Sequence, residues 1–208
     1  MMNGNGRKLL AFWLMLCFAL TCVAKAQAQV RGGDEKAVQY LASYEPRLKE
    51  TTAPAQRISL LLGLAPAAMA AGELEKAGKY AQELLTLSET QKRLVGLYGQ
   101  SIHIGNIVLG HVALTKGNLA KAKEYLLAAG QTPGSPSLNT FGPNMLLAKE
   151  LIEKGERDTV IAYLDLCARF WEQGGSKLEQ WKATIQSGGV PNFGPNLSVG
   201  VSNWHHSR

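Results

Sequence analysis

The chain has 208 residues, of which 46% are hydrophobic and 18% are charged. This composition suits one compact domain with a hydrophobic core, and it excludes extended disorder. The formal net charge is +6. Residues 1–28 hold three basic residues and no acidic one, which leaves 19 Lys and Arg against 16 Asp and Glu, a charge of +3. That charge is scattered along the chain, so we expect no nucleic-acid partner.

The first 28 residues have the pattern of a secretory signal peptide. Arg7 and Lys8 form a short positive region, residues 9–24 are apolar apart from one Thr, and small residues follow at Ala24-Lys25-Ala26 or Ala26-Gln27-Ala28. We therefore expect a cleaved leader and a periplasmic or secreted protein, with membrane contact only through an uncleaved leader. The alternative is a retained anchor, but the apolar stretch has 16 residues, whereas a spanning helix needs about 20.

After cleavage Cys167 is the one remaining cysteine, so the mature chain can form no intramolecular disulfide. Its apolar neighbours predict a small core residue rather than a reactive thiol. We expect residues 29–197 to form the helical domain and residues 198–208 to form a flexible tail.

Glycine and proline divide the mature chain, and the apolar spacing between them is helical throughout. Asp34 is a suitable N-cap for a first helix that ends near Glu50. A second helix is expected from Pro54 to Gly72 and a third over residues 73–87. Pro46 and Pro66 predict a kink or break in the first two of these helices.

The capping-box pattern Ser88-Glu89-Thr90-Gln91 predicts the start of a helical stretch that reaches Lys116. Each of its four interior glycines costs about 1 kcal/mol relative to Ala. We therefore expect either a break near Gly99 or close helix contacts. Further helices are expected over residues 119–129, 143–154 and 156–172, and from a second capping box at residues 176–179. The one clear loop is expected over residues 131–142, and an irregular segment from Gly188.

The predicted helices pair into three copies of one template. The template is a first helix with W-x2-L-G-x2-Y, a turn glycine, and a second helix with A-x3-F. The best copy is Asn106-x2-Leu109-Gly110-x2-Ala113, then Gly117, then Ala122-x3-Leu126. The outer copies run from Leu61 through Gly72 to Ala81, and from Asn144 through Gly155 to Leu164.

This pattern resembles the tetratricopeptide repeat (TPR). Residues 102–110 and 132–145 are similar to segments of uncharacterised bacterial proteins of that kind, and the similarity spans most of residues 55–197. The resemblance implies an all-α fold of antiparallel helix pairs, stacked as a short solenoid with left-handed turn glycines. It implies no activity, and the asparagine and lysine pattern of repeats that clamp a peptide carboxylate is not reproduced. A generic helical bundle is the alternative, because the turn glycines are 45 and 38 residues apart rather than about 34.

No catalytic or cofactor motif accompanies these helices: the sequence has no Gly-x-Ser-x-Gly, no His-Glu-x-x-His and no phosphate-binding loop. His103 and His111 are eight residues apart, which places them about 80° apart around a helix and argues against a shared metal. We expect no cofactor and no metal site. Trp171 and Trp181 could stack on a sugar or peptide, although their helical positions favour a core role.

One pentapeptide is nearly duplicated: Phe141-Gly142-Pro143-Asn144-Met145 recurs as Phe193-Gly194-Pro195-Asn196-Leu197. One interpretation is structural, with the two phenylalanines sealing the ends of the groove. The other is functional, because loops of this length often carry function.

The leading hypothesis is an exported, non-enzymatic scaffold that binds a protein or peptide partner in the cell envelope. In helix-pair solenoids the first helix of each pair lines the concave face. We expect the partner to bind a polar, weakly basic groove formed by His103, Asn106, His111, Asn144 and Lys149. The alternative is an enzyme or small-molecule binder with a pocket between the solenoid and the loop at residues 131–142.

Overall fold

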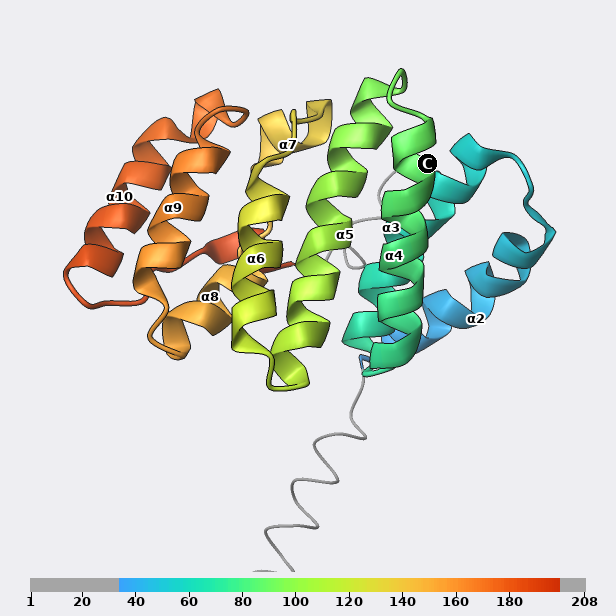
Figure 1. Cartoon of the computed structure of the whole chain (residues 1–208), viewed down its shortest axis with the longest axis horizontal. Coiled ribbons are helices and arrows are strands. Elements are labelled where there is room, and N and C mark those ends of the chain that lie inside the picture. Colours follow the sequence, from blue (N-terminus) through green and yellow to red (C-terminus); the bar gives the residue numbers. More distant parts are fainter. Residues whose placement is uncertain (1–33, 199–208) are drawn as a thin grey trace, which may run out of the picture.

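The computed structural model describes residues 34–198, which form nine α-helices and two short 3-10 helices and contain no strand (Figure 1). The all-α class predicted from the sequence is therefore confirmed for this part of the chain. The leader, residues 1–28, and residues 199–208 of the predicted tail lie outside the described residues.

The N-terminal helices begin where the sequence predicts. Asp34 caps α2 (Glu35–Glu50), and its Oδ1 accepts a hydrogen bond of 2.9 Å from the backbone N–H of Lys36. The next helix, α3 (Pro54–Ala70), has proline in its first turn, where the missing N–H costs little. Pro46 lies inside α2 and Pro66 inside α3, yet both helices continue past these residues. Of the predicted kink or break, the break therefore does not occur at either proline.

The boundary between α4 (Leu74–Thr90) and α5 (Val95–Thr115) corrects the sequence prediction. Ser88 does not cap a new helix: it is buried near the end of α4, and its hydroxyl donates to the Leu85 carbonyl at 2.8 Å. The helix α5 then runs without a break through its glycines. A methyl group on Gly99 would lie 1.7 Å from the Gly134 carbonyl oxygen, and one on Gly110 would lie 2.2 Å from Leu147 Cδ2. The sequence analysis expected either a break near Gly99 or close helix contacts at the glycines, and the structure shows the close contacts.

The C-terminal half contains the remaining elements: α6 (Leu119–Gly130), α7 (Pro136–Phe141), α8 (Leu146–Glu153), α9 (Arg157–Cys167), η1 (Glu172–Gly174), α10 (Gly175–Gln186) and η2 (Gly194–Leu197). The expected loop at residues 131–142 therefore includes a short helix. It forms because the Ser135 hydroxyl accepts from the Leu138 N–H at 3.1 Å. The second predicted capping box is wrong, since α10 already begins at Gly175 and has no side-chain cap.

The turns within the three predicted helix pairs share one geometry. Gly72, Gly117 and Gly155 join α3 to α4, α5 to α6 and α8 to α9, with φ angles of +78°, +80° and +88°. At the middle turn, the Gly117 N–H donates to the Leu114 carbonyl and the Asn118 N–H to the Ala113 carbonyl, both at 2.9 Å. Equivalent hydrogen bonds close the other two turns. The predicted left-handed turn glycines are confirmed, and they reverse the chain as in a Schellman motif.

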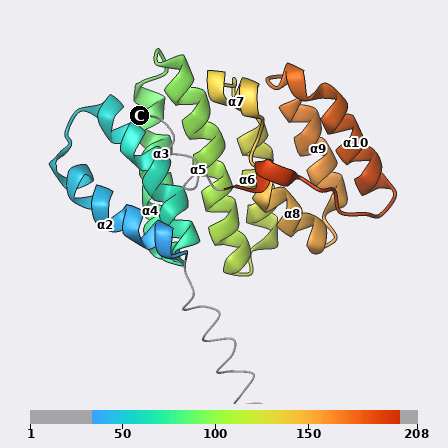
Figure 2. The same cartoon turned by 180° about the vertical axis from the view of Figure 1, so that it is seen from behind.

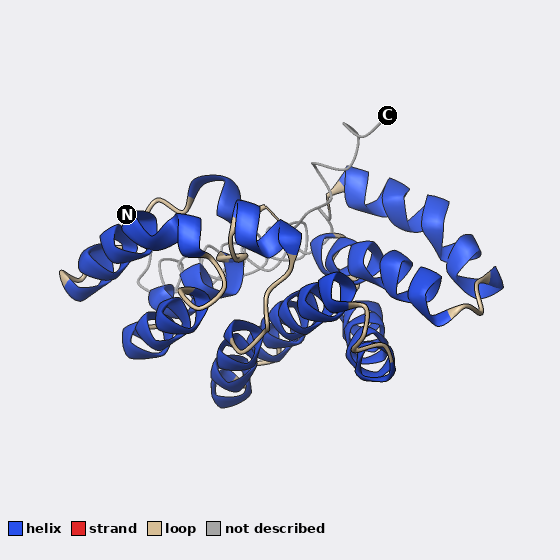
Figure 3. Ribbon diagram, turned by 90° about the horizontal axis from the view of Figure 1, so that it is seen from above, coloured by secondary structure: helices blue, strands red, loops and turns tan. Residues whose placement is uncertain are grey.

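The pairs pack side by side in chain order (Figure 1), and seen from above the row of helices bends into an arc (Figure 3). Two clusters of buried apolar side chains fill the space, one between α2 and α5 and the other between α5 and α10. The central helix α5 belongs to both, with Val108 and Val112 in the first cluster and Ile107 in the second. Cys167, Trp171 and Trp181 are buried in the second cluster, as predicted for core residues.

Candidate partner-binding site

His103 is part of the interior rather than of a groove. Its side chain is fully buried, with Nδ1 at 3.2 Å from the Ala129 carbonyl oxygen of α6. Nε2 accepts a hydrogen bond of 2.9 Å from the backbone N–H of Asn144. Since Nε2 accepts, the proton belongs on Nδ1, which donates to Ala129. Burial lowers the pKa of His103 from 6.5 to about 4, because desolvation penalises the imidazolium.

Asn144, just before α8, also uses all its polar groups internally. Its Oδ1 accepts from the Leu146 N–H at 2.9 Å, and its Nδ2 donates to the Ser198 carbonyl at 2.8 Å. The Asn144 carbonyl accepts from the Tyr163 hydroxyl of α9 at 2.9 Å. His103 and Asn144 are thus brought together, as a buried junction of α5, α6, α8 and α9.

Asn106 follows the same pattern, whereas His111 and Lys149 are nearer the surface. Asn106 is buried, and its Nδ2 donates to the Ile102 carbonyl of its own helix at 2.7 Å. His111 Nδ1 lies 2.9 Å from Glu150 Oε2, which joins α5 to α8, and its side chain is 22% exposed. Lys149 is 41% exposed, with Nζ at 3.4 Å from Glu153 Oε1.

The predicted groove of five polar residues must therefore be corrected. His103 and Asn106 are buried because helix positions that face neighbouring pairs fall inside the stack, and Asn144 is buried in the segment before α8. His111 and Lys149 remain accessible, but each has a carboxylate partner. The accessible surface around α5 and α8 consequently carries both signs of charge, rather than the weakly basic character that we expected.

The two copies of the duplicated pentapeptide contact each other, which the sequence analysis did not foresee. Asn196 Nδ2 donates to the carbonyls of Phe141 and Pro143 at 3.0 and 2.9 Å. In return, the Met145 N–H donates to the Asn196 carbonyl at 2.8 Å. The segment around η2 therefore lies along the start of α8, on the face turned toward the viewer in Figure 2. The duplication was the one sequence signal that could have revealed this contact.

The two phenylalanines of the duplicated segments have opposite environments. Phe193 is 1% exposed, and its ring lies 5.0 Å from that of Trp181 in an edge-to-face arrangement. Phe141 is 74% exposed. The interpretation of two sealing aromatic side chains therefore fits Phe193 and not Phe141.

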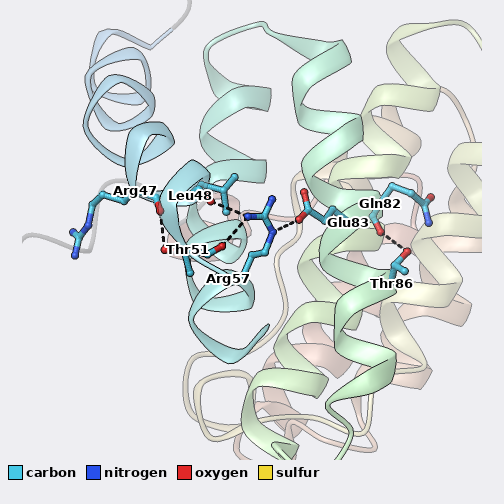
Figure 4. A network of polar contacts seen from close by, with 7 residues as sticks. All are labelled: Arg47, Leu48, Thr51, Arg57, Gln82, Glu83 and Thr86. Atoms are coloured by element: carbon cyan, nitrogen blue, oxygen red, sulfur yellow. Dashed lines mark hydrogen bonds and ion pairs between the residues drawn. The ribbon is translucent and has the colours of Figure 1, made fainter. Parts of the chain in front are cut away.

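A second polar network, absent from the sequence analysis, joins the three N-terminal helices (Figure 4). Arg57 of α3 donates from Nη1 to the carbonyls of Leu48 and Thr51 at 2.8 and 3.0 Å, at the C-terminal end of α2. Its Nε pairs with the Glu83 carboxylate of α4. The guanidinium thus satisfies helix-end carbonyls that have no intrahelical donor, and we interpret this network as structural.

Within residues 34–198, no group of three His, Cys, Asp or Glu side chains could hold a metal ion. No helix in this range is long and apolar enough to cross a membrane. Comparisons of the chain with protein-family models, curated proteins and solved structures find no match.

Proposed function

We propose that the protein is an exported, non-enzymatic scaffold of TPR-like helix pairs that binds a protein or peptide partner in the cell envelope. The observation that carries this proposal is the repeated helix pair, with a left-handed glycine at each of its three internal turns. Pairs of this kind stacked in a bowed row offer an extended surface for a partner. The signal-like leader supports export.

Only the accessible residues of the predicted groove can contact a partner directly. His111 and Glu150 bridge two neighbouring first helices, α5 and α8, and Lys149 lies on α8. Paired charges of both signs can separate to meet complementary charges and backbone groups of a partner, which favours specificity more than raw affinity. A pocket lined by His103, Asn106 and Asn144 would favour the alternative of an enzyme or small-molecule binder, but these three side chains form hydrogen bonds within the protein.

The test is capture of the partner from envelope extract by the mature protein, with mass spectrometry as the readout. We expect the double variant His111→Ala, Lys149→Ala to lose at least tenfold in capture while its helical content and melting temperature stay close to those of the parent. The matched control is Lys121→Ala, which removes an exposed lysine that pairs with Glu124 within α6. Undiminished capture by the double variant would show that the partner binds elsewhere.

A further inference from the structure

The segment around η2 (Gly194–Leu197) is a short piece of chain that the helix pairs hold through defined polar contacts and through the buried side chain of Phe193. Four hydrogen bonds of 2.8–3.0 Å join Asn196, Ser198 and residues 141–145. The linker between α10 and this segment contains Gly188 and Gly189, and Arg157 Nη2 donates to the Gly188 carbonyl at 2.9 Å. The contact surface is thus built from backbone groups before α8 and the side chain of Asn144.

These contacts select the sequence of the bound segment. Two carbonyls, those of Phe141 and Pro143, receive hydrogen bonds from the same Nδ2. Among uncharged side chains only a primary amide has two N–H groups on one nitrogen, and a carboxylate there could only accept. Gly194 has a φ of +52°, which favours glycine. Phe193 fills the space beside Trp181. Phe, Gly and Asn are therefore specified, each by a separate interaction.

We propose that residues 141–145, together with Trp181, form a recognition site for linear segments with the pattern Phe-Gly-x-Asn, and that residues 193–198 occupy this site in cis. The partner is a chain that presents this pattern in an extended or single-turn conformation and displaces the tethered segment. This inference rests on the proposed function and names the class of ligand.

The tether determines how the site must be tested. A segment tethered through a short linker has an effective concentration in the millimolar range, so a free peptide competes poorly with it. Cutting the linker removes this advantage. We would insert a protease recognition sequence between Gly188 and Gly189 of the full chain, cut the folded protein, and add a fluorescent peptide of residues 189–198. Binding is followed by fluorescence anisotropy.

We expect the cut protein to bind this peptide at least tenfold more tightly than the uncut protein does. The peptide with Asn196→Ala should bind the cut protein at least tenfold more weakly, because both carbonyls lose their donor. The control peptide carries Val190→Ser, a change at an exposed position, and should bind like the parent. Equal binding of all three peptides, or no binding by a folded cut protein, would overturn the proposal. So would a cut protein that forms a dimer by exchanging its own segment, because a second copy would then be the occupant.

If cutting unfolds the protein, the uncut chain with Asn196→Ala provides a second test of the recognition site. Its weakened segment should let the parent peptide bind at least tenfold more tightly than it binds the uncut parent, with unchanged circular dichroism, and equal binding would refute the site. The capture experiment with His111 and Lys149 is independent of this site. A failed peptide experiment with successful capture would therefore remove the recognition site and leave the scaffold in place.

Discussion

His103 connects three parts of the chain through its two ring nitrogens. One nitrogen donates to the end of α6, and the other accepts from Asn144, whose side chain in turn holds Ser198. An apolar side chain of similar size would leave the Ala129 carbonyl and the Asn144 N–H without these partners, and each unsatisfied buried group costs roughly 1–3 kcal/mol. The internal hydrogen bonds of the histidine therefore account for its presence in the core.

Protonation of His103 should destabilise the fold at acidic pH. Its folded-state pKa of about 4 lies below the ordinary 6.5, so the unfolded chain binds more protons between these values. The contribution is fully present above pH 6.5 and is lost as the pH falls toward 4. In urea unfolding, the decrease in unfolding free energy from about pH 7 to about pH 4.5 should be roughly 2 kcal/mol smaller for His103→Gln than for the parent. Gln keeps a donor and an acceptor without titrating. Parallel pH curves for the two proteins would contradict this.

Helix packing in the middle pair depends on small residues where α5 and α6 cross. A methyl group added to Gly110 would lie 3.2 Å from Tyr125 Cβ and 3.5 Å from the Ala122 carbonyl oxygen, as well as against Leu147 of α8. Ala122 is fully buried in the same crossing. Small side chains here let two backbones approach, which compensates for the low helix propensity of glycine.

Enlarging Ala122 should therefore destabilise the protein. Ala122→Leu adds three carbons to a filled crossing, and we expect a loss of about 1–3 kcal/mol in unfolding free energy from overpacking. Ala120→Leu, on the exposed side of the same helix, is the matched control and should change stability by less than about 0.5 kcal/mol. Urea denaturation of both variants gives the comparison. Similar midpoints for Ala122→Leu and the parent would mean that this alignment of the helix pair is wrong.

Over the whole molecule, the elements could be predicted from the sequence and the polar contacts between them could not. Apolar spacing and the glycines at positions 72, 117 and 155 identify the pairs, because both signals are local. The capping patterns at Ser88 and Ser176 failed because tertiary packing extends α4 and starts α10 earlier, and packing overrides a local hydrogen bond worth about 1 kcal/mol. The prediction of an accessible groove was wrong for a related reason. Helical spacing shows which residues share one face of a helix, but the packing of neighbouring helix pairs decides whether that face is buried or exposed.

The same limit applies to long-range partners. His103 and Asn144 are 41 residues apart, Asn144 and Ser198 are 54 apart, and Arg57 and Glu83 are 26 apart. No periodicity within one helix encodes such contacts. The duplicated pentapeptide did single out the two segments, but their mutual contact depends on how α10 returns the chain toward α8.

The predicted export of the whole chain has a direct test in the mature N-terminus. A signal peptide presents small residues to the peptidase after its apolar region, so the mature protein should begin at Gln27 or Gln29. N-terminal sequencing of the protein from the periplasm or medium gives the cleavage site. The double variant Ala26→Phe, Ala28→Phe should block cleavage, because it places bulky side chains in the small-residue positions. The matched control is the double variant Asn3→Ser, Asn5→Ser, which lies outside that region and should leave cleavage unchanged. Recovery of the full-length parent chain from the membrane fraction would instead establish a retained anchor, and the proposed partner would then have to be sought at the membrane surface.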